Sequence, residues 1–435
     1  MNMNDIIVKK RDGGKLTQGE IQHVVRGAVS GEIPDYQLSA LLMAIFFQKM
    51  DKEETFELTN AMRYSGDVID LSQVRGIKVD KHSTGGVGDK TTLIVAPLAA
   101  ACGVPIAKMS GRGLGFTGGT VDKLEAIPGF RTTLAPEEFL QQVNEIGISV
   151  IGQTVHITPA DKKLYALRDV TGTVENLSLI ASSIMSKKLA AGSDAIVLDV
   201  KCGSGAFMEN QEDAEELGQI MCEIGIAAGK RTVAVISDMS QPLGKAVGNS
   251  LEVIEAIDTL KGNGPADITE LSLKLAGIMI YLGGRAKTPG EGQIMAQHAL
   301  QSGAGLEKLR SFIRRQGGDG AVIDDYDLFP YAGYHQDIVA EQSGYIHEIC
   351  AKTIGLASQH TGAGRATKED HVDLAAGLYL HKKMGDRVSK GEVIATLYGN
   401  QKSKLAAGVK EAQSAFVIRQ EKTEKPKLIK EVLGL

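Results

Sequence analysis

Short apolar runs alternate with helical stretches from Gly76 onward, and this alternation constrains the fold more than any other feature of the chain. Helical stretches, for example residues 91–102 and 213–230, lie between most of the runs. Strands that alternate with helices are typical of an α/β layer with mostly parallel pairing. The runs expected to be strands are residues 77–79, 106–109, 148–151, 195–200 and 232–237.

Each of these runs is followed by polar or glycine-rich sequence. In chain order the segments are KHSTGG, SGRGLG, GQT, KCGSG and DMSQPLG. Open α/β sheets bind ligands at the carboxyl ends of their strands. We therefore expect these loops to gather at one edge of the sheet and to form the binding site.

The first 65 residues predict a group of helices. Thr17 and Glu20 have the spacing of a capping box, and apolar residues follow at helical spacing from Ile21. A second helix is expected after Pro34 and a third over residues 52–64. Two more helices interrupt the later strand–helix alternation: one starts at Thr158, with Pro159 in the first position, and the other covers residues 178–191. We expect these two to return to the N-terminal lobe and to leave a cleft between lobes.

The character of the sequence changes again after about Asp337. Residues 344–346, 375–380 and 391–397 look β-rich or mixed, and the last twenty residues are expected to form a surface tail. Residues 382–392 resemble half of a lipoyl or biotinyl domain, but the hairpin that carries the modified lysine is absent. A structural cap on the α/β lobe is the better interpretation.

Composition and charge exclude several classes of protein. The net charge of −5 and the absence of Trp, with only 5% aromatic residues, disfavour a nucleic-acid binder. Four well-separated cysteines without a CxxC pair support neither a zinc ribbon nor a disulfide framework, and reduced thiols in the cytoplasm are expected. The N-terminus lacks the apolar core of a secretory signal, and the longest uncharged stretch, residues 91–107, is too short and interrupted to span a membrane.

Two loops concentrate the glycines, which number 51 of 435 residues against a usual share of about 7%. Loop one is residues 81–92 (KHSTGGVGDKTT), and loop two is residues 108–120 (KMSGRGLGFTGGT). Glycine lets the backbone approach an anion, and a helix that follows adds the positive end of its dipole. Ser, Thr and Lys side chains supply further donors. The two loops therefore predict a phosphate cradle.

Two nucleotide-binding motifs are only superficially matched. Residues 113–118 fit GxGxxG, but residues 111–119 contain five glycines, so the match carries little weight. The acidic residue of a dinucleotide site would be Glu137 or Glu138, which follow a proline at a helix start rather than a strand. Loop one resembles the end of a P-loop, but Asp89 stands where that motif requires glycine.

Four longer segments resemble the pyrimidine-nucleoside phosphorylases, which include thymidine phosphorylase. They are KHSTGGVGD, KMSGRGLGFTGGTVDKLE, ADKKLYALRDVTGTV and ASSIMSKKLAAGSDAIVLDVK, and the resemblance extends to about residue 420. It implies reversible phosphorolysis of uridine, thymidine and deoxyuridine to the free base and a pentose 1-phosphate. It also implies a homodimer whose lobes close on each other. The expected fold is α/β, with a helical lobe (residues 1–70, joined by 159–192), a larger lobe with a mostly parallel mixed sheet (76–158 and 193–335) and a C-terminal α+β domain (340–420).

The resemblance also assigns site residues. His82 is the expected proton donor, because the usual pKa of histidine lies near neutrality. Arg168 and Lys187 are expected to stabilise the leaving base, and Met109 to contribute only its backbone. The pairs Tyr165–Arg168 and Ser183–Lys187 have helical spacing, so each pair shares one helix face. The phosphate-binding set is Lys81, His82, Ser83, Thr92, Lys108, Met109, Ser110 and Thr120, and the base-binding set is Tyr165, Arg168, Ser183 and Lys187.

A potassium ion is implied as well, with ligands at Gly88, Lys90, Leu243, Ala246 and Glu255. Two residues depart from the family pattern. Lys90 stands where threonine is expected, so an ammonium group near the ion competes with it. Phe116 replaces the usual histidine and removes a polar group near the sugar, which affects rate or pentose preference. Neither change touches the phosphate or base donors, so an active enzyme is expected.

Two alternative functions stay open at the level of sequence. Anthranilate phosphoribosyltransferase has a similar glycine loop, but it needs magnesium and acidic ligands, and no adjacent Asp–Glu pair stands at the corresponding position of the lobe. A non-catalytic nucleoside or phosphate sensor is the second alternative. The sequence offers neither an output module nor a DNA-binding motif in its favour.

Overall fold

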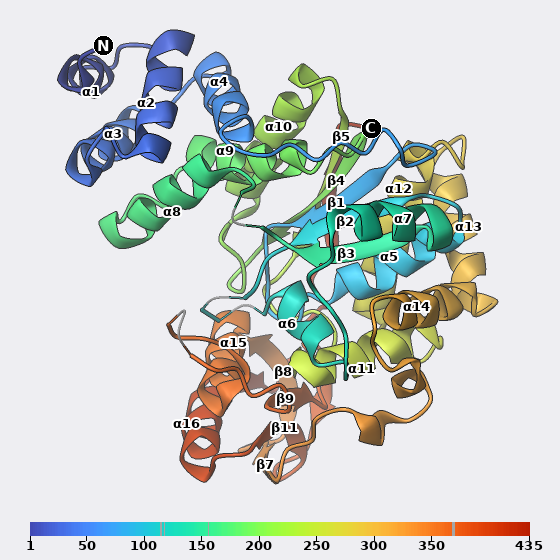
Figure 1. The fold of residues 1–435 in the computed structure, drawn as a ribbon. Helices are drawn as coiled ribbons and strands as arrows, with labels where there is room; N and C mark the ends of the chain where they lie inside the picture. Colours follow the sequence, from blue (N-terminus) through green and yellow to red (C-terminus); the bar gives the residue numbers. More distant parts are fainter. Residues whose placement is uncertain (114, 117, 155, 368–369) are drawn as a thin grey trace.

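A computed structural model describes residues 1–435 except 114, 117, 155, 368 and 369. Figure 1 shows a helical lobe at one end, a sheet with flanking helices in the middle and a small β-rich domain at the other end. This confirms the predicted α/β class with its helical and C-terminal parts. Leu114 and Thr117 of loop two, and with them two positions of the GxGxxG match, lie outside the described residues.

The helical lobe contains α1 (Met3–Arg11), α2 (Gln18–Ser30), α3 (Asp35–Gln48) and α4 (Lys52–Arg63). The predicted capping box is confirmed, because Thr17 and Glu20 bond each other's backbone amides. Two later helices, α8 (Pro159–Thr171) and α9 (Leu177–Ala190), lie beside α2, α3 and α4 (Figure 1). Ala160, Leu164 and Leu179 belong to the same buried cluster as the apolar residues of α1–α4. This common core is the basis on which we propose that residues 159–192 belong to the helical lobe.

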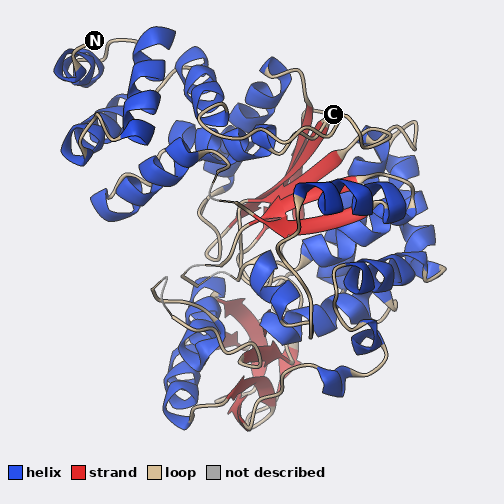
Figure 2. Cartoon of the chain, viewed as in Figure 1, coloured by secondary structure: helices blue, strands red, loops and turns tan. Residues whose placement is uncertain are grey.

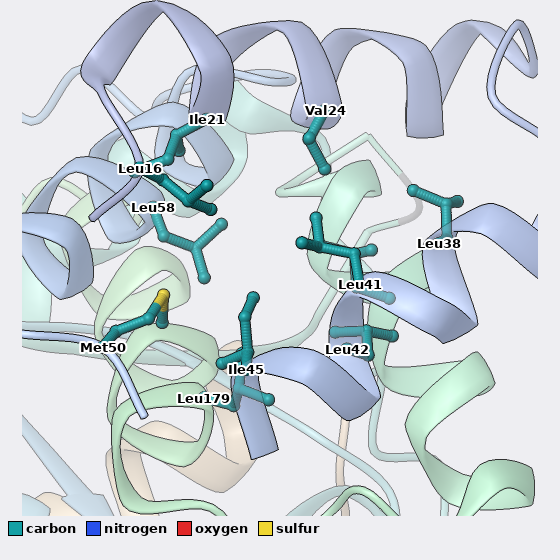
Figure 3. A pocket seen from close by; sticks show the side chains of 11 residues that line it. Leu16, Ile21, Val24, Leu38, Leu41, Leu42, Ile45, Met50, Leu58 and Leu179 are labelled. Carbon is teal, nitrogen blue, oxygen red and sulfur yellow. The ribbon is translucent and has the colours of Figure 1, made fainter. Parts of the chain in front are cut away.

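A small cavity inside this core is lined by apolar side chains, shown in Figure 3. They come from α2, α3, α4, α8, α9 and the segments between them, so the cavity is a packing feature where several elements meet. Its lining offers no polar group to a substrate. The lining residues are Leu16, Ile21, Val24, Leu38, Leu41, Leu42, Ile45, Met50, Leu58, Leu164 and Leu179.

The central sheet has the order β1-β4-β5-β13, and its first three strands are parallel. Figure 2 draws the strands in red among the helices that flank them. The first three strands are β1 (Val79–Ser83), β4 (Ala195–Cys202) and β5 (Arg231–Asp238), and a second parallel pair is formed by β2 (Ile106–Ser110) and β3 (Ile148–Gly152). The accompanying helices are α5 (Thr91–Ala101), α6 (Thr120–Glu125), α7 (Pro136–Ile146), α10 (Gln211–Ala227), α11 (Asn249–Leu260), α12 (Ala266–Leu282), α13 (Pro289–Gln301) and α14 (Ala304–Arg315).

The structure corrects three local predictions. The first strand was expected at residues 77–79 but is β1, Val79–Ser83, in which Asp80 and Lys81 are buried in ion pairs. The last residues are not a surface tail: β13 (Ile429–Leu433) pairs antiparallel with β5 and covers the edge of the sheet. Thr158 precedes α8 in a left-handed conformation (φ 46°, ψ 54°), and its side chain makes no capping bond.

The C-terminal domain is built on two small sheets. One has the order β6-β9-β11-β7 and includes β6 (Ala246–Gly248) from the α/β lobe, so the two parts share a sheet. The other has the order β10-β8-β12. The remaining elements are β7 (Tyr334–Val339), β8 (Gly344–Ile349), α15 (Ala351–Ser358), β9 (Gly377–Leu380), β10 (Arg387–Val388), β11 (Val393–Gly399), α16 (Lys402–Gln413) and β12 (Phe416–Arg419).

No helix among the described residues has the length and apolar character needed to cross a membrane.

Candidate active site

Loop one and loop two form the walls of a polar cavity, here called the loop cavity, at the carboxyl ends of β1 and β2. Thr92 lies in the first turn of α5, so the positive end of this helix dipole faces the cavity. The predicted phosphate residues His82, Ser83, Thr92, Lys108, Met109, Ser110 and Thr120 all line it. The further lining residues are Gly85, Gly86, Asp89, Gly111, Arg112, Gly113, Gly118, Gly119, Gln153 and Lys188.

Two buried lysines bring positive charge to the loop cavity and share one carboxylate. Lys188 Nζ lies 2.8 Å from Asp80 Oδ2 and donates to Met109 O at 3.2 Å. Lys108 Nζ lies 3.4 Å from Asp80 Oδ1 and also bonds the carbonyl oxygen of Lys81. The pKa of Lys108 is lowered to about 8, chiefly by burial and also by the neighbouring Lys188, against the opposing effect of Asp80. The cavity is therefore cationic at neutral pH.

Lys81 is the predicted phosphate residue that does not line this cavity. Its side chain points to the other face of β1, where Nζ lies 3.5 Å from Asp199 Oδ2 and bonds Thr91 Oγ1. Successive side chains of a strand alternate between faces, so Asp80 and His82 share one face and Lys81 the other. The structure thus places Lys81 behind loop one.

Loop two is fixed by a buried carboxylate and by the C-terminal domain. Asp122 Oδ2 accepts a bond from Gly113 N at 2.7 Å, and Asp122 Oδ1 accepts one from Arg365 at 2.8 Å. The carbonyl oxygen of Arg365 in turn accepts from Gly115 N at 3.1 Å. Gly119 has no room for a side chain, because a Cβ there would lie 2.0 Å from Gly113 N. These contacts link the described residues of loop two to α6 and to the C-terminal domain.

A larger cleft, the interlobe cleft, adjoins the loop cavity and reaches α8 and α9. Tyr165, Arg168, Ser183 and Lys187, the predicted base-binding residues, all line it. Both pairs therefore face the same space, as their helical spacing requires. Across the cleft lie Thr84, Gln153, Thr154 and Phe207, which come from loops of the α/β lobe.

The guanidinium group of Arg168 is buried, and the described hydrogen bonds do not use all of its N–H groups. It donates to the carbonyl oxygens of Thr173 (3.1 Å), Leu179 (3.2 Å) and Val174 (2.6 Å). Since a guanidinium carries five N–H groups, these described bonds leave two for a ligand. Burial lowers the pKa of Arg168 to about 10, so the group stays charged at neutral pH.

Lys187 is oriented by two partners on the helical lobe. Its Nζ donates to Ser183 Oγ at 2.9 Å and forms an ion pair with Asp161 of α8. The Tyr165 ring lies near the Arg168 guanidinium, 5.8 Å from its centroid to Cζ, within the range of a cation–π contact. Two cations and two hydroxyl groups are thus gathered on one wall of the cleft.

The loop cavity and the interlobe cleft meet at a junction lined by His82, Ser83, Arg112 and Gln153, which contact both spaces. Burial lowers the pKa of His82 well below its usual value, and the charges of Lys188 and Lys108 lower it further. The imidazole is therefore neutral at pH 7 while the cavity holds no anion.

The predicted potassium ligands lie beside the loop cavity, and Lys90 changes their chemistry. Lys90 Nζ donates to Leu243 O at 3.1 Å and Ala246 O at 2.9 Å, and it forms an ion pair with Glu255. Three of the five expected ligands are therefore bonded to an ammonium group, and the residues present do not fit a potassium ion at the same oxygen atoms. Among the described residues no cluster of three His, Cys, Asp or Glu side chains could hold a metal ion.

Several lining residues escaped the sequence analysis. Lys188 follows Lys187 directly but faces the loop cavity instead of the cleft, and only the fold distinguishes the two. Gln153 belongs to the GQT segment, which the strand-end pattern had singled out without naming a residue. Phe207 projects from the loop after β4 and is half exposed at the cleft. Phe116 packs against the apolar core near Gly355 and lines neither space.

Comparison with known proteins places this geometry in a family. Three family models match: "Glycosyl transferase family, helical bundle domain" over residues 4–66, "Glycosyl transferase family, a/b domain" over 75–306, and "Pyrimidine nucleoside phosphorylase C-terminal domain" over 345–419. The chain is 57% identical over 401 residues to a pyrimidine-nucleoside phosphorylase of Geobacillus stearothermophilus, covering 92% of this chain and 93% of the relative. It is 58% identical over 403 residues to the one of Bacillus subtilis, covering 93% of both chains.

One solved structure extends the comparison to the fold. The crystal structure of anthranilate phosphoribosyltransferase from Thermus thermophilus matches with a TM-score of 0.59 at 23% identity. The match covers 71% of this chain and 98% of that one. At this identity the likeness concerns the fold alone.

The charge state of Lys108 predicts how anion binding varies with pH. Sulfate stays a dianion across the range, so its affinity reports the protein alone. Because Lys108 loses its proton above its pKa of about 8, sulfate affinity should fall by up to about tenfold per pH unit beyond that point. Isothermal titration calorimetry from neutral pH to about pH 9.5 checks this. In Lys108→Met the affinity should be lower at neutral pH and nearly flat over the same range.

Lys163→Met is the matched control, because Lys163 lies on α8 and pairs with Asp35 at 2.6 Å, and it lines neither space. Its sulfate affinity and pH profile should equal those of the unchanged protein. A flat profile in the unchanged protein would remove Lys108 from the anion site.

Proposed function

The chain belongs to the pyrimidine-nucleoside phosphorylases, a family of pentosyltransferases, and we propose that it cleaves uridine, thymidine and deoxyuridine with inorganic phosphate. The reaction gives the free pyrimidine and ribose or deoxyribose 1-phosphate, and it is reversible. The high identity over more than nine-tenths of the chain supports the reaction class. The residue roles below rest on the geometry of the site.

The junction between the two spaces is the observation that carries this proposal. A cationic cavity bounded by two glycine loops opens directly into a cleft with Arg168 and Lys187 on its far wall. Phosphorolysis needs this order: an anion on one side of the anomeric carbon and a leaving heterocycle on the other. The sugar would then lie at the junction, between His82, Ser83 and Gln153.

The reaction needs position and charge rather than a covalent protein intermediate. An oxygen atom of phosphate forms a bond to the anomeric carbon while the bond from that carbon to the ring nitrogen breaks. The electron pair of the broken bond moves into the pyrimidine, whose carbonyl oxygens become more negative. Donors from Arg168 and Lys187 stabilise this charge, which grows as the bond breaks, and so lower the barrier.

His82 donates the proton to the departing base once phosphate is bound. In the ligand-free protein its pKa lies well below its usual value, because of burial and the nearby lysines. A phosphate dianion in the loop cavity offsets the charges of Lys108 and Lys188, and it therefore raises the pKa of His82 toward neutrality. Bound phosphate thus favours the protonated form of His82, which then donates its proton to the departing pyrimidine.

The two alternatives fit less well. The likeness to anthranilate phosphoribosyltransferase is a likeness of fold at 23% identity, whereas the identity to pyrimidine-nucleoside phosphorylases is 57–58%. A sensor would not need a proton donor and two base-directed cations around one junction. Formation of uracil from uridine and phosphate without added magnesium separates both alternatives from the proposal.

The enzyme is proposed to act as a homodimer in the cytoplasm. Tyr36, Met43 and Phe47 of α3 lie on one helix face, and Tyr36 and Phe47 are each 74% exposed. Such an apolar stripe on a helix surface is typical of an interface. All four cysteines are free, which suits a reducing compartment.

Removing the guanidinium group of Arg168 should impair the chemical step. In Arg168→Ala the developing charge on the base loses a buried cation, and kcat/KM for uridine and thymidine should fall by about 10²–10³. Uracil or thymine release, followed by absorbance with saturating phosphate, measures the effect. Lys163→Met on the same helix should retain the full rate. An Arg168→Ala enzyme that matches the parent would refute the assigned role.

The proton-donor role of His82 predicts a pKa that depends on phosphate. NMR titration of the His82 ring should show a neutral imidazole at pH 7 without ligand and an upward pKa shift on addition of phosphate. In Lys188→Met the ligand-free pKa of His82 should already be higher than in the unchanged protein, because one of the positive charges that lower it is absent. A ring pKa that phosphate leaves unchanged would contradict the proposed acid.

The homodimer is testable at the α3 stripe. Phe47→Glu places a charge within the proposed interface and should convert the dimer to a monomer, measured by light scattering after gel filtration. Met62→Leu, at a buried position of the same lobe, should stay dimeric. A parent protein that runs as a monomer at micromolar concentration would overturn the assignment.

A further inference from the structure

The oxygen atoms assigned to potassium already surround a positive group of this chain. Lys90 Nζ donates to two backbone carbonyl oxygens, those of Leu243 (3.1 Å) and Ala246 (2.9 Å), and to the carboxylate of Glu255. A lysine ammonium has three N–H groups and no acceptor. All three are used here, and each points to an oxygen atom. This is the arrangement that a monovalent cation makes with carbonyl and carboxylate oxygens.

The surroundings are shaped around this ammonium group. Glu255 also accepts bonds from the backbone amides of Lys245 (2.9 Å) and Ala246 (3.1 Å), so its carboxylate cannot turn away. Gly244 is in the left-handed region (φ 70°), and a Cβ there would lie 2.2 Å from Glu255 Oε2 and 2.9 Å from Lys90 Nζ. Both the backbone conformation and the space therefore favour glycine at this position. The Lys90 side chain itself is fully buried.

A metal ion has no room beside Lys90. An ion bound to the same three oxygens would touch the ammonium group, and two like charges repel strongly where water is excluded. A second lysine adds to this, because Lys383 Nζ donates to Gly244 O at 2.7 Å and lies 3.0 Å from Asp267 Oδ2. The ammonium groups of Lys90 and Lys383 thus already supply two positive charges at this place.

We propose that Lys90 takes the place of a monovalent metal ion and fixes loop one without potassium. It joins loop one to the segment before β6 and to α11, which carries Glu255. Lys123, which follows loop two, makes a parallel link: its Nζ donates to Asp89 O at 2.7 Å and lies 2.8 Å from Glu252 Oε2, one helical turn before Glu255 on α11. Lys90 is a positioning residue, and the inference holds whichever pyrimidine nucleoside the enzyme prefers.

The experiment compares the unchanged protein with Lys90→Thr in potassium chloride and in choline chloride at equal ionic strength. Thermal unfolding and sulfate affinity are measured, so the result does not depend on catalysis. The unchanged protein should behave alike in both salts. Lys90→Thr should be destabilised in choline and should bind sulfate more weakly there. Potassium should restore both properties in a saturable manner, shifting the folding equilibrium roughly tenfold at about ten times its Kd.

Lys10→Thr is the matched control, because Lys10 forms an equally buried pair with Glu54 (2.8 Å) in the helical lobe. It should lose the same stability in both salts. Saturable stabilisation of the unchanged protein by potassium but not by choline would overturn the proposal. A folded Lys90→Thr whose thermal unfolding and sulfate affinity do not change with potassium would also overturn it. If Lys90→Thr does not fold, rubidium-soaked crystals of the unchanged protein decide: anomalous density beside Glu255 refutes the proposal, and its absence there supports it.

Discussion

Positive charge buried beside a binding cavity is the constraint on which the α/β lobe depends. A buried ion that lacks a partner costs on the order of several kcal/mol, so each lysine needs a carboxylate placed for it. Asp80 forms ion pairs with Lys108 and Lys188 on one face of β1, and Asp199 forms an ion pair with Lys81 on the other face. This strand, at the end of the four-stranded sheet, can therefore bury two charged residues, Asp80 and Lys81. Among the described residues, the buried lysines of this lobe are Lys81, Lys90, Lys108, Lys123 and Lys201, and Lys188 reaches it from α9.

The same constraint links parts of the chain that are distant in sequence. Glu252 and Glu255 lie one turn apart on α11, and they pair with Lys123 after loop two and Lys90 in loop one. The C-terminal domain adds Arg365, which bonds Asp122 beneath loop two. A domain that resembles a carrier module in sequence therefore contacts and supports loop two here. Both loops depend on charges contributed by residues more than a hundred positions away.

The sequence predicted the class of fold because periodicity is a strong signal for amphipathic helices and apolar strands. The family resemblance assigned four residues to one site, and helical spacing fixes Tyr165 with Arg168 and Ser183 with Lys187 on common helix faces. The sequence missed β1 beyond Val79, since ion pairs that make a polar strand buried are contacts between distant residues. It missed β13, because a charged run such as EKTEKPKLIK gives no apolar alternation before the strand itself. The roles of Lys188 and Lys81 depend on which face of an element each occupies, and that follows from packing.

Hydrogen-bond accounting separates Lys90 from the lysines that face the cavities. Within the described residues, Lys90 uses all three of its N–H groups on protein oxygens, whereas Lys108, Lys187 and Lys188 each use two. The third donor of each cavity lysine is left for a ligand, while the other two fix its direction. Groups held in this way need little reorganisation when charge develops in the transition state, which is the condition for effective electrostatic catalysis. Lys90, with all three N–H groups bonded to protein oxygens, has no donor left to offer a ligand.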